Sequence, residues 1–460
     1  MRRLILSLAV AAVTSGCALT PDYERPEIDV PTGFQAQEAA GASIANLEWW
    51  ELFGDEALQN LIKTALEENK DLGVALSRIA ESRSALTITR ADQLPFIDVT
   101  GRGGRLKQSE DLVPGSGARG DYGLSADVSY ELDLWGQLRR ATEASQADLL
   151  ATEAAYRNVT ISLVGNVASF YLLLRDLDQR LQISVDTVQT RNESLAIVQA
   201  RFDKGTVPQI DVNQAEVELA IAEAAVASFE REIVLTENAL RILLGRNPGP
   251  VDRGLRLDQQ VFPPEIPAGL PSELVQRRPD VVQAEEVLIA ETARIGVAEA
   301  LRYPSVSLTG SYGTASDELG DLTGSSAETW GIGANIFAPI FNSGALKAQA
   351  QAQRARAEAA LLDYELTLQQ AFREVEDALV SIRTLRVEHA ARARQVVAAR
   401  NAARLSKARY DGGVVDYLEV LDSERTRFNA ELEESQTLQQ YLNSIVELYK
   451  ALGGGWSPAP

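Results

Sequence analysis

The sequence predicts an α+β membrane protein that is internally duplicated, with long helices and four β-strands in each chain. The first observation is a repeat: ARFDKGTVPQIDVNQAE at residues 200–216 returns as ARYDGGVVDYLEVLDSE at residues 408–424. The second is composition, because Ala, Gln, Glu, Leu and Arg dominate long tracts, as they do in long helices. The third is a set of short segments in which apolar and polar residues alternate, the pattern of strands. A chain built twice over accounts for all three.

The first residues predict an export signal. Residues 1–16 begin with two arginines and continue with an apolar run, Leu4 to Val13, that is too short to cross a bilayer as a mature helix. Small residues then precede Cys17, the single cysteine of the chain. This resembles the bacterial lipobox, which implies that Cys17 is lipidated, with palmitate among the attached chains; an ordinary signal with an incidental cysteine is the alternative. In lipoproteins, Ala18 in place of Asp implies sorting to the outer membrane.

Charge and composition argue against several function classes. The net charge of −21 argues against a nucleic-acid partner, because phosphate binding needs a basic surface. With one cysteine and one histidine, the chain cannot form an internal disulfide or a Cys/His metal cluster, so we expect no metal and no cofactor. His389 lies beside Glu388 and Arg392, which is typical of a polar helix face. An enzyme is therefore the least favoured class, and the sequence contains no Gly-Lys-Ser/Thr phosphate-binding loop.

Four segments predict strands with one apolar and one polar face. Each pair of segments surrounds a long loop, at residues 107–120 and 314–328, so each pair predicts a β-hairpin. Pro95 and Pro304 mark the entries to the two hairpins. The alternating segments are Ile97–Thr100, Leu124–Leu134, Ser305–Tyr312 and Thr329–Ala338.

Long helices fill most of the remaining chain. One helix of about 35 residues follows the Trp49-Trp50 pair, which we interpret as a packing anchor, and ends before Pro95. After each hairpin, a helix of about 64 residues, roughly 95 Å long, runs to a Gly turn, and a further helix follows. Such lengths are typical of coiled coils.

These patterns divide the chain into successive segments. Each repeat contains a helix, a β-hairpin, a long helix, a Gly turn and a further helix, and a segment rich in proline separates the two repeats. We predict a signal peptide at 1–16, a lipidated extended arm at 17–48, a first structural repeat at 49–245, a Pro-rich linker at 246–279, a second structural repeat at 280–453 and a C-terminal tail at 454–460.

Four strands with a lipid-like outer face suggest a membrane barrel, but four strands cannot close, and an open sheet edge cannot face lipid. Barrels of about eight strands have interiors filled by side chains, so a dimer would form a plug. Three chains would supply twelve strands and room for water, with ring symmetry. We therefore expect a homotrimer with a 12-stranded barrel in outer-membrane lipid, continued below the membrane by the long helices of all three chains.

Several motifs occur in an order that resembles one family. They are Cys17 with Pro21-Asp22-Tyr23, Trp49-Trp50 with Phe53 and Asp55, Tyr130–Gly136, Arg277–Asp280, Pro339–Gly344, and the two repeated stretches at 200–216 and 408–424, which contain the Gly turns and are called the tips below. Over essentially the whole mature chain, this set resembles the TolC-like outer membrane efflux proteins, in their NodT-like lipoprotein branch. The resemblance implies a homotrimeric barrel continued by an α-helical coiled-coil barrel across the periplasm. It also implies the exit duct of a tripartite pump for small molecules such as drugs, docked to a periplasmic adaptor and an inner-membrane transporter of RND type, and not an enzyme.

The resemblance further implies a periplasmic aperture, where the helices of the family coil inward beyond the Gly turns. The matching positions are Leu418, Glu419 and Asp422 in the second repeat and Ile210, Asp211 and Gln214 in the first. Glu419 and Asp422 are three residues apart and share a helix face, so threefold symmetry would gather them into an acidic ring. Asp416 followed by Glu419 also fits a capping box, which leaves the role of Glu419 open between lining the aperture and capping the helix.

The two tips have compatible physical and functional interpretations. Glycine at Gly205 and Gly413 permits a tight helix-to-helix turn. By resemblance, the tips form the surface where the hairpins of the adaptor dock tip to tip. This predicted docking surface comprises Gly205, Thr206, Val207, Gly413, Val414 and Val415.

Two other functions stay open on the sequence alone. The same fold could serve type I protein secretion, and the lipid anchor favours small-molecule efflux over it by resemblance only. A coiled-coil periplasmic structural lipoprotein is a different class, but such a protein would not need four alternating strands.

Overall fold

The computed structural model describes residues 22–28, 30–34, 53–107, 109, 111, 117–260, 275 and 277–454. The predicted signal peptide, the lipidation candidate Cys17 and the Trp49-Trp50 pair lie outside these residues, as do 261–274 of the linker and 455–460 of the tail. Contacts divide the chain into two compact units, which are described separately. The first contains Met1–Ile28, Ser77–Glu153 and Gln283–Leu366, and the second contains Asp29–Leu76, Ala154–Val282 and Thr367–Pro460.

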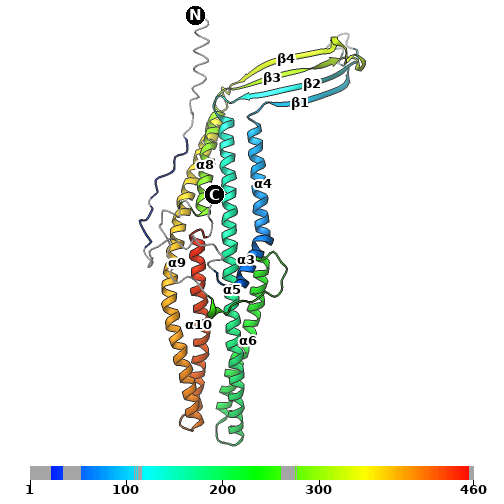
Figure 1. The fold of residues 1–460 in the computed structure, drawn as a ribbon. Helices are drawn as coiled ribbons and strands as arrows, with labels where there is room; N and C mark the ends of the chain where they lie inside the picture. The colour runs from blue at the N-terminus through cyan, green and yellow to red at the C-terminus, as the bar shows by residue number, and fades with distance from the viewer. Residues whose placement is uncertain are drawn as a thin grey trace. The chain divides into compact units, whose positions relative to one another are not determined.

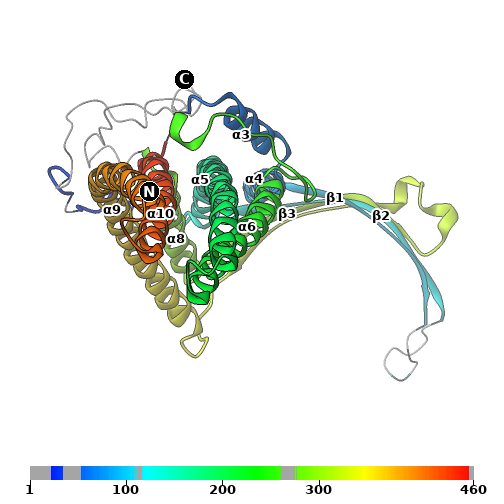
Figure 2. The ribbon, with the colours of Figure 1, turned by 90° about the horizontal axis from the view of Figure 1, so that it is seen from below.

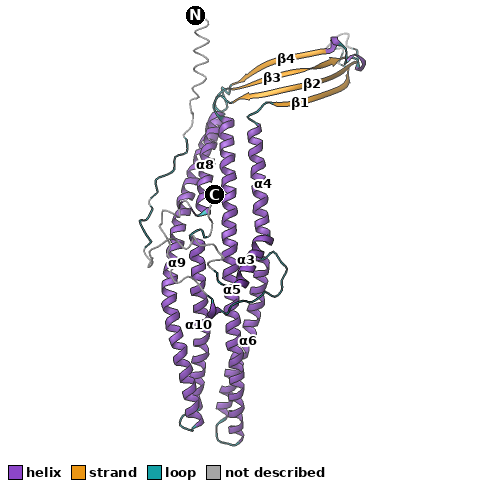
Figure 3. Cartoon of the chain, viewed as in Figure 1, coloured by secondary structure: helices purple, strands orange, loops and turns teal. Residues whose placement is uncertain are grey.

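The first unit contains a single antiparallel sheet of four strands, whose order is β1-β2-β3-β4 (Figures 1 and 3). Its two hairpins come from the two halves of the chain and pair with each other through β2 and β3. The four strands that the alternation predicts are therefore confirmed. Their bounds are Phe96–Leu106 for β1, Arg119–Leu132 for β2, Ser305–Ser316 for β3 and Glu328–Phe337 for β4.

The strands extend further into the hairpin loops than the sequence predicts. β1 continues through Gly101 and Gly103 to Leu106, because the backbone of this Gly-rich stretch pairs with β2 although its side chains do not alternate. β3 likewise continues to Ser316, inside the predicted loop 314–328. That loop contains the short 3-10 helices η3, Leu319–Asp321, and η4, Ser325–Ala327. Leu134 was expected in β2 but follows its end.

The two faces of the sheet differ sharply in chemistry. On one face, Ile97 lies opposite Val128, and Ile336 lies opposite Val306. On the other face, Asp127 lies opposite Ser311. The apolar face is open in the single chain, where Ile332 is 87% exposed. Figure 2 shows that the strands curve along their length. A curved sheet with a continuous exposed apolar face is an interaction surface, because soluble monomers rarely expose large apolar patches.

The first helical segment is broken, which corrects the single helix that we predicted there. It consists of α3, Glu56–Glu68, and α4, Lys70–Ala91. Asn69 between them has an extended backbone (ψ 134°). Its side-chain amide donates to the carbonyl of Leu243 at 2.8 Å, and its side-chain oxygen accepts from the amide of Leu72 at 3.1 Å. The break is therefore stabilised by a contact with a distant part of the chain, which periodicity cannot reveal.

The four longest helices form two matched pairs, as the internal duplication predicts. A helix of 67 residues is followed in each half by one of 35 residues. None of the helices within the described ranges combines the length and apolar content that a membrane-spanning helix needs. The bounds are Gln137–Asp203 for α5, Gln209–Leu243 for α6, Pro279–Ala300 for α8, Ala345–Asp411 for α9 and Tyr417–Ala451 for α10, and the 3-10 helix η2 spans Leu257–Gln259.

A buried carboxylate organises the middle of the second unit. Asp55 is only 1% exposed. Its two carboxylate oxygens accept four hydrogen bonds, from the amide of Ala57 at 2.9 Å, the hydroxyl of Tyr171 at 2.7 Å, the amide of Leu255 at 2.9 Å and the side-chain amide of Gln260 at 2.9 Å. Asp55 thus ties the start of α3 to α5 and to the segment around η2.

Gly254 permits this close packing. Its amide donates to the Tyr171 hydroxyl at 2.9 Å, and a Cβ added to it would lie 2.0 Å from Oδ1 of Asp55. No side chain fits at that distance, so the segment around η2 requires glycine at this position.

The N-terminal arm is fixed to the first unit by charge. Arg25 Nε donates to Glu285 at 2.7 Å, and the Tyr23 hydroxyl donates to the same carboxylate at 3.0 Å. Arg140 forms an ion pair with Asp22 at 2.5 Å. Asp22, Tyr23 and Arg25 thus attach the arm to α5 and α8.

Candidate functional site at the helical tips

The two Gly turns share one backbone design. In the first, the amides of Gly205 and Thr206 donate to the carbonyls of Phe202 and Arg201, at 2.7 and 3.0 Å. In the second, Gly413 and Val414 repeat this arrangement in α9, at 3.0 and 2.9 Å. This is the Schellman motif, in which a residue with positive φ ends a helix. The φ angles of Gly205 and Gly413 are 72° and 70°, so glycine meets a backbone requirement at both tips.

An apolar cluster joins the two helical hairpins just behind the tips. The rings of Tyr410 and Tyr417 lie 5.3 Å apart, and the guanidinium of Arg201 lies 4.4 Å from the centre of the Tyr410 ring. The cluster is buried, although it is close to the ends of four helices. It consists of Val198, Val212, Ala215, Tyr410, Tyr417 and Val420. The tips therefore form one packed structure rather than two independent turns.

The structure divides the predicted docking residues into two groups. Val207 and Val415 are partly buried and pack against the tip cluster. Gly205, Thr206, Gly413 and Val414 are exposed, Val414 to 69%. An incoming partner can reach the second group directly, whereas the two partly buried valines support the tips from inside.

The predicted aperture residues differ in exposure and in partners. Leu418 and Ile210 are each 59% exposed, whereas Gln214 is half-buried. Asp422 is exposed and pairs with Arg425 at 2.7 Å on the same helix. Glu419 accepts from Arg409 Nη1 at 2.6 Å, which links the start of α10 to the end of α9. Both carboxylates of the predicted acidic ring thus have an arginine beside them, a contact that the spacing did not indicate.

The contacts at the start of α10 show which residue caps this helix. Asp416 is the N-cap, and its carboxylate accepts from the amide of Glu419 at 3.3 Å. The Glu419 carboxylate, however, contacts Arg409 rather than completing a capping box at the amide of Asp416. Asp416 therefore caps the helix, and the side chain of Glu419 lies on the surface toward α9.

The carboxylate of Asp211, at the start of α6, lies in the field of another acid. Partial burial raises the pKa of Asp211, and the nearby carboxylate of Asp416 raises this pKa further. The starts of α6 and α10 therefore bring like charges together at the tips. Such repulsion is relieved when the two helix starts separate.

A buried charged layer further along the same helices was missed by the sequence analysis. Arg191 is 5% exposed, forms an ion pair with Glu218 at 3.0 Å and lies over the ring of Phe428. Burial lowers the pKa of Arg191, and Glu218 and Glu424 oppose this shift. A signal existed, because Arg191 stands seven residues before the buried Val198, at a core position of the helical repeat.

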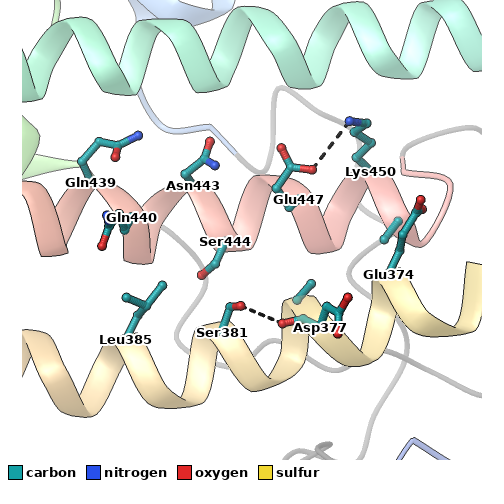
Figure 4. A pocket seen from close by; sticks show the side chains of 12 residues that line it. Glu374, Asp377, Ser381, Leu385, Gln439, Gln440, Asn443, Ser444, Glu447 and Lys450 are labelled. Atoms are coloured by element: carbon teal, nitrogen blue, oxygen red, sulfur yellow. Dashed lines mark hydrogen bonds and ion pairs between the residues drawn. The ribbon is translucent and has the colours of Figure 1, made fainter. Parts of the chain in front are cut away.

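A polar cleft lies between α9 and α10 within the second unit (Figure 4). Its volume is about 430 Å³. Glu374, Asp377 and Ser381 line it from α9, and Lys450 pairs with Glu447 at 3.6 Å on α10. Most of the residues that line it are polar or charged, and the cleft follows the line along which the two helices pack. Across the part of the chain that the structure describes, no group of three or more His, Cys, Asp or Glu is placed to hold a metal ion.

Known proteins match both repeats of the chain. The model of the outer membrane efflux protein family matches residues 61–246 and 270–454. The toluene efflux pump outer membrane protein TtgC of Pseudomonas putida is 36% identical over 467 residues, which cover 99% of this chain and 96% of TtgC. The cation efflux system protein CusC of Escherichia coli is 33% identical, with 98% of each chain covered. The crystal structure of the Campylobacter jejuni CmeC outer membrane channel is similar with a TM-score of 0.90 and 26% identity, over 96% of each chain.

Proposed function

The chain belongs to the outer membrane efflux protein family, and from that premise we propose that three copies form the exit duct of a tripartite efflux pump. As a member of this family, it is an efflux channel component of the outer membrane. In the proposed assembly, each chain supplies four strands to a twelve-stranded barrel, and the helices of the three chains continue the passage through the periplasm. The proposed partners are a periplasmic adaptor and an inner-membrane transporter of RND type.

The observation that carries this proposal is the sheet itself. Its apolar face is exposed, with Ile332 and Trp330 exposed to 87% and 72%. Its outer strands β1 and β4 have no further strand beside them in the described chain. In lipid, such edges must be paired, so a membrane location requires other chains to close the sheet. Three chains give a barrel wide enough for a water-filled passage.

The proposed mechanism is passive at this component. The transporter moves the solute, and the channel supplies a wet path and a gate, so the chain acts as a duct and not as an enzyme. The exposed residues of the two tips, Thr206 and Val414 among them, receive the adaptor. The starts of α6 and α10 form the aperture, and docking separates them. The like charges of Asp211 and Asp416 favour that separation.

Small organic molecules are the proposed solutes. TtgC is named for toluene and CusC for cations, and TtgC is the more similar of the two, at 36% against 33% identity. Deletion of the gene is expected to lower the minimum inhibitory concentrations of drugs, toluene or detergents at least several-fold, and a plasmid copy is expected to restore them. Sensitivity to metal cations alone would instead favour cation export, and a secretion defect with unchanged sensitivities would favour type I protein secretion.

Asp422 provides a test of the aperture. In planar bilayers, Asp422→Ala is expected to raise single-channel conductance or to lower cation preference, because three negative charges leave the proposed ring. Arg425→Ala is the matched control, since it removes the positive partner of the same pair and is expected to raise cation preference. Unchanged conductance and selectivity in both variants would count against this position as a constriction.

The proposed lipid anchor at Cys17 is tested by the mass of the mature protein. A diacylglyceryl and a palmitoyl chain on Cys17 would add a mass that Cys17→Ser lacks. An unmodified mature wild-type chain would refute lipidation.

A further inference from the structure

Two aromatic residues interrupt the polar face of the sheet. Phe96 lies opposite Ser129, and Phe337 lies opposite Ser305, so both phenylalanines share the face of the serines. They are 65% and 70% exposed. Phe96 is the first residue of β1 and Phe337 is the last residue of β4, so both lie at the end of the sheet that leads into helices. They occupy opposite edges and do not meet within one chain.

The edges of the sheet indicate what these residues contact. β1 and β4 are the outer strands, and each therefore has one row of backbone N–H and C=O groups that faces no other strand of the described chain. In the proposed trimer, on which this inference rests, β4 of one subunit lies beside β1 of the next. The two rows then satisfy each other, because lipid cannot.

Two requirements together select one register for this seam. Residues of the polar face must lie opposite residues of the polar face, which excludes every second register. The register should also give the most backbone hydrogen bonds, and it does so when all ten residues of β4 find a partner among the eleven residues of β1. A single register satisfies both requirements. It places Phe337 directly opposite Phe96 of the partner subunit.

The other pairs in this register are chemically compatible. Glu328 faces the partner's Arg105, which joins opposite charges at the far end of the seam. Ile336 faces the partner's Ile97 on the apolar side. Trp330 faces the partner's Gly103, so the large ring covers a residue without a side chain. Cross-strand pairs of these kinds stabilise sheets.

Barrel geometry provides an independent check. The pairing runs from Phe96 through Ser129, Thr309 and Gly333, and across this seam it reaches the partner's Thr100. Each subunit therefore shifts the register by four residues. For three subunits and twelve strands, this gives a strand tilt of about 35°, with spacings of ~3.4 Å along and ~4.8 Å across the strands. Outer-membrane barrels have tilts of about 35–45°, so the register closes a realistic barrel.

We propose that Phe337 and Phe96 of the partner subunit form an aromatic contact at each seam, on the polar face that lines the passage. The three contacts join neighbouring subunits at the end of the barrel nearest the helices. The two phenylalanines of each contact also place apolar rings on the face of the sheet that lines the passage, where most other side chains are polar.

Cysteine cross-linking tests the register. In outer membranes, oxidation of a variant with both Phe96→Cys and Phe337→Cys is expected to convert most of the protein into a covalent trimer, and neither single variant should cross-link. Matched controls combine Phe337→Cys with Asp98→Cys or with Thr100→Cys, which share the same face but lie two and four residues further along β1. Stronger cross-linking in either control, or none in the Phe96 pair, would overturn the proposed contact.

Trimer stability separates this inference from the proposed function. If the wild-type protein does not migrate as a heat-sensitive trimer, both the duct and the seam are refuted. If trimers form without the expected cross-link, only the register is refuted. As a second measurement, Phe96→Ala and Phe337→Ala should each lower the dissociation temperature of the trimer. The double variant should lower it by less than the sum, because one contact is lost in either case. Additive shifts would contradict a direct contact.

Discussion

Gly413→Leu is expected to abolish drug efflux while leaving trimers assembled. A Cβ at Gly413 meets nothing within 4 Å, so the fold has room for the larger side chain. The positive φ costs a residue with a side chain about 1–2 kcal/mol, which a large helical protein tolerates. Leu would instead project from the exposed tip and prevent the close approach of an adaptor. The minimum inhibitory concentrations should fall to those of the deletion strain, with heat-sensitive trimers unchanged on gels.

The control for this result is Gly344→Leu. Gly344 has φ 84° and also has nothing within 4 Å of an added Cβ. It lies just before the first residue of α9, at the opposite end of that helix from the Gly turn. It therefore carries the same backbone strain without altering a tip. Efflux should persist in Gly344→Leu and fail in Gly205→Leu, which alters the other tip. Normal resistance in Gly413→Leu would refute docking at this tip.

Asp55→Ala is expected to destabilise the second unit by about 3 kcal/mol or more, because it leaves buried donors without an acceptor. The variant loses all four hydrogen bonds to the carboxylate. Gly254→Ala should also destabilise the unit, since its Cβ would overlap Oδ1 of Asp55. Thermal unfolding in detergent measures both changes. Asp252→Ala is the matched control in the same segment, where the side chain is exposed, and should change stability little.

The same carboxylate gives stability a defined pH dependence. Burial alone would raise the pKa of Asp55, but hydrogen bonds from Gln260, Tyr171 and two backbone amides outweigh it and lower this pKa. A depressed folded pKa contributes stability that is present above the unfolded pKa, near 4, and is lost as the pH falls through the folded value. Acidification below about pH 4 should therefore destabilise the wild type more than Asp55→Asn. Parallel stability curves would contradict this role of Asp55.

Local sequence patterns predicted most of the fold. Alternation located four strands, because side chains on a strand point to opposite faces in turn. The Gly turns at Gly205 and Gly413 were also predicted, because a positive φ is a local requirement. The alternation predicted a β1 that is too short. Gly101 and Gly103 have no side chains that could alternate, but their backbones still pair with β2.

The helix that follows the second Gly turn was predicted from the sequence, and Glu419 and Asp422 lie in its first two turns, but the contacts of these two residues were not predictable. Their arginine neighbours were not predicted, and for Glu419 the partner Arg409 belongs to another helix. The burial of Arg191 was missed for a related reason, since its acidic partner Glu218 lies on α6.

By itself, the sequence determined the duplication, the two-faced strands, the long helices and the Gly turns, because each depends on residues close together in the chain. Tertiary structure alone decided the break at Asn69, the hydrogen bonds around the buried Asp55 carboxylate and the packing of the tips. Asp55 shows the physical reason. Asp55 meets Tyr171 and Gln260, which lie 116 and 205 positions away, and no local periodicity encodes such a contact. A buried carboxylate is stable only where distant donors converge on it, and the folded chain supplies them.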